Sequence, residues 1–161
     1  MSFTVSFSDA QSVIAAVTLG GVGYPILLRG RHGIGKSSVV YQFAAQRGLP
    51  IIERRISQMT EGDLLGLPST DGRVTTWNPP AWFKQACDEP VVLFLDELDR
   101  GTLEVRQGVF ELADSRKLAG HGLHEGTIII AACNGGEGET NYLVAELGPA
   151  ELDRWTVFDV E

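Results

Sequence analysis

The sequence predicts an α/β fold with a mainly parallel sheet, and three observations carry that prediction. Short apolar runs alternate along the chain with segments of helical spacing, which is typical of strands joined by crossover helices. One run leads into a glycine-rich loop, Gly30–Ser37. A later run, Val91–Leu95, is followed directly by two acidic residues, Asp96 and Glu97. Because parallel strands end at one edge of a sheet, we expect these polar groups to meet there. Right-handed crossovers would place helices on both faces and give three layers.

Length, composition and charge bound the class of protein. The 161 residues suit one domain with one core, and 43% hydrophobic and 21% charged residues are typical of globular proteins. The net charge of −8 provides no overall attraction to nucleic acid or anionic membranes, so we expect neither as a partner. No apolar run reaches the roughly 18 residues of a membrane span. Residues 1–5 lack the features of a signal peptide, so we expect a cytoplasmic protein.

The first third of the chain predicts two helices and two strands. A helix is expected over Asp9–Val17, with Ser8 as its N-cap. Tyr24–Leu28 is a short apolar run that predicts a buried strand directly before the glycine-rich loop. Ser38–Ala45 continues from the loop as a helix with one apolar face. Leu49–Ile56 predicts the second strand.

Residues 57–82 interrupt this alternation, because three glycines and three prolines break any long element. An Asp-Gly pair at positions 71–72, followed by Val74–Trp77, predicts a hairpin turn. A short helix is expected over Trp82–Cys87. We interpret the stretch as an inserted surface hairpin, since long loops in compact domains tend to carry function; the alternative is a plain connection.

The second half of the chain returns to alternating elements. Val91–Leu95 predicts a strand that is buried on both faces. Thr102–Ser115 predicts an amphipathic helix, and Lys117–Gly126 a second, smaller hairpin. A buried strand over Thr127–Cys133 follows, and then a short helix over Leu143–Asp153 that a Gly-Pro pair interrupts. Residues 155–160 predict the fifth strand.

The glycine-rich loop fits G-x-x-x-x-G-K-[ST], the phosphate-binding P-loop. Glycines let successive backbone N–H groups point at one anion, and the next helix adds its positive N-terminal dipole. Lys36 can reach the β- and γ-phosphates, and the Ser37 hydroxyl can bind Mg²⁺. A chance glycine turn is the alternative, which the strand before the loop and the helix after it disfavour. The residues expected to contact the nucleotide are Gly30, His32, Gly33, Ile34, Gly35, Lys36, Ser37 and Ser38.

Polar residues at two strand ends are candidates for metal binding and catalysis. Asp96 would hold Mg²⁺ directly or through water, and Glu97 would orient and deprotonate an attacking water. Two solvated acids at a strand end are the alternative, which the upstream P-loop disfavours. Asn134 could position that water or sense the γ-phosphate, and a turn-forming residue before two glycines explains it equally well.

Other ligand chemistries have little support in the sequence. Two cysteines make no disulfide framework, and without a C-x-x-C pair we expect no metal other than Mg²⁺. The cysteines and histidines concerned are Cys87, Cys133, His32, His121 and His124. A GTPase or small-molecule kinase is a further alternative: Asp63–Gly66 matches the D-x-x-G of GTPases, but no N-K-x-D follows, so guanine specificity is not expected.

These motifs together resemble the AAA+ ATPases, and specifically their MoxR-like branch, over nearly the whole chain. Gly30–Ser37 matches Walker A, and Val91–Arg100 matches Walker B with the D-E-[IL]-[ND]-R that follows it. Asn134 matches sensor 1. Leu143–Trp155 resembles the segment that ends L-D-R-F, whose arginine finger would be Arg154.

Two further stretches favour the MoxR-like branch. Asp63–Pro68 together with Trp77–Trp82 resembles its helix-2 insert, and Lys117–Gly126 falls where these proteins have a pre-sensor-1 hairpin. The resemblance implies a P-loop NTPase three-layer sandwich of AAA+ type, with a five-stranded, mainly parallel sheet and an insert hairpin. We expect residues 1–161 to form this core alone, without the helical lid that family members carry after the last strand.

The resemblance also implies a function. ATP and Mg²⁺ would be bound in a hexameric homo-oligomeric ring that hydrolyses ATP to remodel or assemble protein complexes, with a protein client or a lid-bearing partner. Arg154 would reach the neighbouring subunit's site; the alternative is a surface arginine that pairs with Asp153 or Glu151. A nucleotide-dependent binding module with little turnover is the alternative function.

Overall fold

A parallel sheet forms the middle layer of the structure, a computed structural model that describes residues 2–19, 23–134 and 147–161. The sheet has six strands in the order β1-β10-β2-β9-β6-β3, and every neighbouring pair is parallel. The strands are β1 (Ser2–Val5), β2 (Ile26–Arg29), β3 (Ile51–Arg55), β6 (Val92–Asp96), β9 (Ile128–Cys133) and β10 (Thr156–Val160). The parallel α/β sheet expected from the sequence is therefore confirmed.

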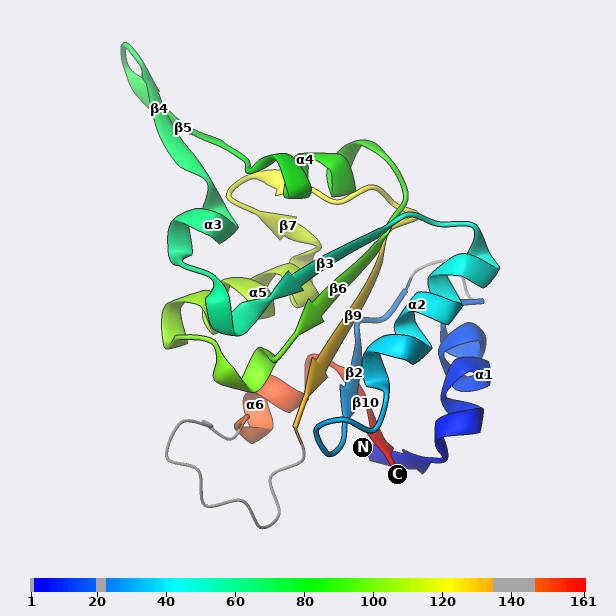
Figure 1. The fold of residues 1–161 in the computed structure, drawn as a ribbon. Coiled ribbons are helices and arrows are strands. Elements are labelled where there is room, and N and C mark those ends of the chain that lie inside the picture. The colour runs from blue at the N-terminus through cyan, green and yellow to red at the C-terminus, as the bar shows by residue number, and fades with distance from the viewer. Residues whose placement is uncertain (1, 20–22, 135–146) are drawn as a thin grey trace.

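Helices cover both faces of the sheet, as Figure 1 shows. The helices are α1 (Phe7–Thr18), α2 (Lys36–Arg47), α3 (Glu61–Leu65), α4 (Ala81–Asp88), α5 (Leu103–Ser115) and α6 (Pro149–Leu152). Two short 3₁₀ turns, η1 (Ile56–Gln58) and η2 (Leu98–Arg100), follow β3 and β6. In Figure 1, α1 and α2 lie on one side of the sheet and α3, α4 and α5 on the other. None of the helices within the described ranges is long and apolar enough to span a bilayer.

The expectation of five strands was wrong by one, because β1 adds a sixth at the sheet edge. Its four residues pair with β10 from Ser2↔Val157 to Val5↔Val160, and a contact so distant in sequence leaves little local pattern. The helix that follows begins earlier than expected. Its N-cap is Ser6, not Ser8, and the Ser6 side chain accepts a hydrogen bond from the Asp9 N–H at 3.2 Å.

The central strands separate two cores, which explains their continuously apolar sequences. On β2, Ile26 and Leu28 pack with α1 and α2, whereas Leu27 between them joins the core on the other face. Phe94 and Leu95 of β6 divide in the same way.

Two antiparallel hairpins lie outside the main sheet. The insert hairpin pairs β4 (Leu67–Asp71) with β5 (Val74–Asn78) and projects from the body in Figure 1. This confirms the expected hairpin and rejects a plain connection. The smaller hairpin pairs β7 (Lys117–Leu118) with β8 (His121–Gly122), also as expected. Of the helix expected over Leu143–Asp153, the structure has α6, and residues 143–146 lie outside the described residues.

We predict that the base of the insert hairpin tolerates no side chain at Gly66. This glycine has φ +86°, and a Cβ atom there would lie 1.9 Å from the Asn78 carbonyl oxygen. Gly66→Ala should lower the free energy of unfolding by about 2 kcal/mol more than Gly72→Ala, because backbone must move to relieve the overlap. Gly72 is the matched control, with φ +68° and open space around it. Urea unfolding of both variants measures the difference, and equal losses would contradict the prediction.

Candidate nucleotide-binding site

The glycine-rich loop connects β2 to α2 and exposes backbone N–H groups. Gly33 and Gly35 adopt left-handed conformations, with φ of 81° and 94°, which glycine adopts without strain. Gly35 is the N-cap of α2 and provides no side-chain hydrogen bond to the first turn. The amides at this helix start are therefore available to an anion.

Close packing fixes the beginning of the loop. A Cβ atom at Gly30 would lie 2.6 Å from the Val160 carbonyl oxygen, so the loop backbone rests against the end of β10. The other predicted contact residues differ in exposure. Ile34 packs on the core below α2, Ser37 is half-buried, and the exposed members of the set are His32, Gly33 and Ser38.

Lys36 lies across the mouth of the loop. Its side chain is buried, and Nζ donates hydrogen bonds to the carbonyl oxygens of Gly30 at 2.6 Å and Arg31 at 2.9 Å. Burial lowers the pKa of Lys36, and the nearby carboxylates of Asp96 and Asp99 partly offset that effect. An ammonium held by two carbonyl groups can exchange them for phosphate oxygens, which bind it more strongly.

The two acids at the end of β6, Asp96 as its last residue and Glu97 directly after it, have different surroundings. Asp96 is half-buried, and its Oδ1 accepts a hydrogen bond from the Glu97 N–H at 2.8 Å. Burial raises the pKa of Asp96, and that hydrogen bond opposes the rise. Glu97 adopts the left-handed conformation, with φ 55°, which turns the chain sharply after the strand. Its carboxylate accepts a hydrogen bond from the Ser57 hydroxyl, which η1 provides.

Sequence reasoning missed Ser57. The residue follows β3, which pairs directly with β6 through Arg55↔Asp96. The available signal was that Ser57 is a polar residue just beyond the end of a strand, the same kind of position that Glu97 occupies after β6.

Asn134 follows β9 and joins the same edge of the sheet. Its backbone N–H donates a hydrogen bond to Oδ2 of Asp99 at 3.2 Å. Strand β9 lies between β2 and β6, with Arg29 opposite Cys133 and Leu95 opposite Ala131. The structure therefore brings the glycine-rich loop, Asp96, Glu97 and Asn134 to one edge, as expected, while their individual roles stay predictions.

Arg154 lies apart from these residues. It precedes β10 and lies near the amino-terminal ends of the strands, opposite the glycine-rich loop, since Thr156 pairs with Ile26, the first residue of β2. Its Nε donates a hydrogen bond to Asp114 Oδ2 at 2.6 Å, and a second guanidinium nitrogen donates to the Ala150 carbonyl at 2.5 Å. The alternative pairing with Asp153 or Glu151 was wrong in its partner: the acid is Asp114.

The carboxylate of Glu151 is bound instead by a buried arginine of α5. Nη2 of Arg106 donates hydrogen bonds to the two Glu151 carboxylate oxygens, at 2.9 and 2.8 Å. This contact fixes α6, and with it the segment that carries Arg154, against α5.

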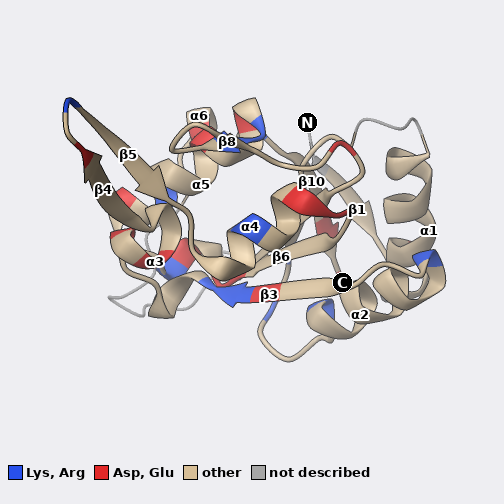
Figure 2. Cartoon of the chain, turned by 90° about the horizontal axis from the view of Figure 1, so that it is seen from above, with Lys and Arg blue, Asp and Glu red and all other residues tan. Residues whose placement is uncertain are grey.

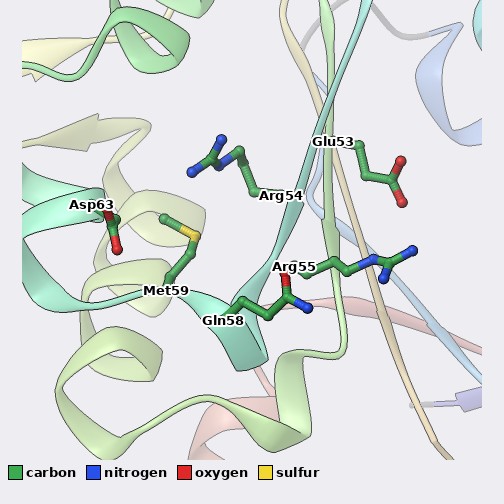
Figure 3. Close-up of a pocket in the computed structure, with 6 residues that line it drawn as sticks. All are labelled: Glu53, Arg54, Arg55, Gln58, Met59 and Asp63. Atoms are coloured by element: carbon green, nitrogen blue, oxygen red, sulfur yellow. The ribbon is translucent and has the colours of Figure 1, made fainter.

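A cavity of about 330 Å³ beside β3 and α3 lies outside the predicted site. Figure 3 shows Arg54 and Arg55 pointing to opposite sides of β3, and Arg54 lies over the ring of Trp82 at 5.5 Å. The lining residues are Glu53, Arg54, Arg55, Gln58, Met59 and Asp63. Acidic and basic positions are interspersed over the view in Figure 2, which shows no single basic face.

In this parallel sheet a glycine-rich loop follows β2, and acids lie at the end of β6, two strands away. This arrangement defines a P-loop NTPase. A family model described as the AAA domain of the dynein-related subfamily matches residues 25–150, more than half of the chain. The chain belongs to this family. The resemblance to AAA+ ATPases is thereby confirmed. The match does not extend to the MoxR-like branch, which stays a prediction.

Individual proteins agree with the family. Midasin of Giardia intestinalis is 35% identical over 96 residues, which cover 58% of this chain and 2% of midasin. The chain thus spans a small fraction of that relative's length.

Two solved structures share the fold. A protein of Cytophaga hutchinsonii described as a candidate ATPase superposes with a TM-score of 0.65 at 17% identity, covering 95% of this chain and 46% of that one. A full-length MCM homolog from Methanopyrus kandleri superposes with a TM-score of 0.60 at 16% identity, covering 94% and 32%.

Replacing Lys36 should weaken nucleotide binding while the fold survives. Lys36→Ala removes the only side-chain cation that the described loop turns inward, so the dissociation constant for ATP should rise about 30-fold or more. Lys84→Ala is the control, because Lys84 is exposed and pairs with Asp88 on α4. Calorimetric titration measures affinity and thermal melting measures folding. Unchanged affinity for ATP would contradict the P-loop assignment.

Proposed function

We propose that this chain binds ATP with Mg²⁺ and hydrolyses it as the AAA+ core of an oligomeric ring. One observation carries the proposal: the loop lysine, an acid pair and a polar strand end occur together at one edge of the sheet. The donor set fits the ligand. Uncapped amides and Lys36 suit phosphates, and the Ser37 hydroxyl with the Asp96 carboxylate suits Mg²⁺.

Each group has one task in this proposal. Lys36 and the loop amides bind the phosphates, and Mg²⁺ held by Ser37 and Asp96 would neutralise part of their charge. Glu97 accepts a proton from the attacking water, which Asn134 positions. The water oxygen bonds to the γ-phosphorus, and the bond to the ADP oxygen breaks. Before the attacking water is bound, the Ser57 hydroxyl donates a hydrogen bond to the Glu97 carboxylate.

The wider assignment is also part of the proposal. The insert hairpin at β4–β5 and the ending Leu152–Trp155 support the MoxR-like branch, whose members form hexameric rings. We propose that the ring remodels or assembles protein complexes in the cytoplasm, with a protein client or a lid-bearing partner chain. In such a ring Arg154 serves the adjacent subunit, which its position away from this chain's own loop supports.

Two contacts favour a second candidate, a nucleotide-dependent binding module with little turnover. Glu97 is engaged by Ser57, and Arg154 is engaged by Asp114 of the same chain. Both groups would have to leave these partners before they could act on ATP. The ATPase rate measured against protein concentration separates the candidates, because a ring enzyme speeds up on assembly and a binding module does not.

Removing the base should greatly reduce turnover while ATP binding is kept. Glu97→Gln keeps the shape of the side chain but accepts no proton, so turnover should fall by about 10²–10⁴ while ATP affinity is kept. Glu89→Gln is the control, since Glu89 is exposed at the end of α4, before β6 begins. Phosphate release measures turnover. A Glu97→Gln rate close to that of the unmodified protein would assign the base to another group.

Arg154→Ala should leave binding intact and reduce turnover by up to about 10³–10⁵, the range found for arginine fingers. Asp114→Ala is the matched control, because it removes the same ion pair and keeps the guanidinium. If the ion pair alone mattered, the two variants would lose equal activity.

A mixing experiment tests whether the finger acts in trans. Arg154→Ala chains keep Glu97, and Glu97→Gln chains keep Arg154, so some mixed interfaces contain both intact groups. Activity of the mixture should therefore rise above that of either variant alone. Assembled, subunit-exchanged mixtures without such a rise would exclude a finger in trans.

A further inference from the structure

Asp99 is a buried acid for which the proposed reaction has no task. It lies in η2, two residues after Glu97, and is only 3% exposed. A buried carboxylate is costly unless it is hydrogen-bonded or paired, so its presence in a core position requires an explanation.

One oxygen of Asp99 has a specific partner. Oδ2 accepts the hydrogen bond from the Asn134 N–H at 3.2 Å, which joins η2 to the residue directly after β9. The other oxygen, Oδ1, is buried and has no hydrogen-bond partner among the residues that the structure describes. The side chain therefore faces the end of β9, away from solvent.

The charge of the same carboxylate also acts on the loop lysine. Burial lowers the pKa of Lys36, and the charges of Asp99 and Asp96 both oppose that lowering. Asp99 also belongs to the turn that begins with the left-handed Glu97, where Arg100 N–H donates to the Glu97 carbonyl at 3.0 Å. Asp99 thus belongs to the turn that carries Glu97 and is hydrogen-bonded to Asn134 at the end of β9.

We propose that Asp99 is a positioning residue that fixes Asn134 relative to Glu97, an inference that rests on the proposed ATPase function. Its carboxylate anchors the Asn134 backbone, so the amide side chain of Asn134 starts from a defined point beside the turn that carries the base. Displacement of a group by about 1 Å can cost two orders of magnitude in rate. Loss of the hydrogen bond between Asp99 and Asn134 should therefore lower turnover, whereas the binding of phosphates by the glycine-rich loop should not change.

A pair of substitutions separates the anchor from the charge. Asp99→Asn removes the charge but keeps an oxygen that accepts the Asn134 N–H, whereas Asp99→Ala removes both. Relative to Asp99→Asn, Asp99→Ala should lower kcat about 10- to 100-fold at equal ATP affinity, with rates expressed per nucleotide-binding site. Equal kcat values for the two variants would overturn the proposal.

Amide hydrogen exchange measures the hydrogen bond between Asn134 and Asp99 directly and does not depend on turnover. The Asn134 N–H should be protected in the unmodified protein and in Asp99→Asn, and should exchange faster in Asp99→Ala. If the unmodified protein shows no turnover, the proposed ATPase function fails, and the exchange rates alone decide the role of Asp99. Equal protection in all three proteins would overturn it.

Thr127→Val is the control for general loss of packing. Thr127 is buried directly before β9, at the opposite end of that strand from Asn134, and its hydroxyl donates a hydrogen bond to the Ala86 carbonyl at 2.9 Å. It should lower stability without changing kcat per site. If Asp99→Ala does not fold, Asp99→Leu takes its place. If neither folds while Asp99→Asn does, the acid serves folding and the proposal is overturned.

Discussion

Burial of the parallel sheet on both faces is the constraint on which the rest of the structure depends. Strands with no exposed face must be apolar along most of their length, so β2, β6 and β9 have room for polar chemistry only at or beyond their ends. Parallel pairing brings those ends to one edge. The glycine-rich loop, the acid pair and Asn134 are therefore neighbours because of the sheet, although about 100 residues separate the first from the last.

This constraint explains why much of the fold could be predicted. Val92–Leu95 and Ile128–Cys133 are apolar without interruption, and each is followed by a polar residue, so both strand and site follow from the same local pattern. The Asp-Gly turn of the insert hairpin and the P-loop spacing are also local. Family membership through residues 25–150 agrees with these local signals.

The features that could not be predicted depend on contacts distant in sequence. Strand β1 is defined by its pairing with β10, at the other end of the chain. Ser57 meets Glu97 only because η1 and η2 follow adjacent strands. Asp114 meets Arg154 because α6 packs on α5 through Arg106 and Glu151, which no short motif records. Sequence patterns identify which residues are polar, and only the packing shows which of them touch.

The backbone at Glu97 has a consequence for how this protein can evolve. A left-handed residue other than glycine stores strain, so glycine or asparagine would suit the turn better as pure structure. In a mutant library selected for thermal resistance alone, position 97 should drift away from glutamate. In a library selected for growth that depends on the protein, it should not. The identity of one residue then records whether selection acts on folding or on chemistry.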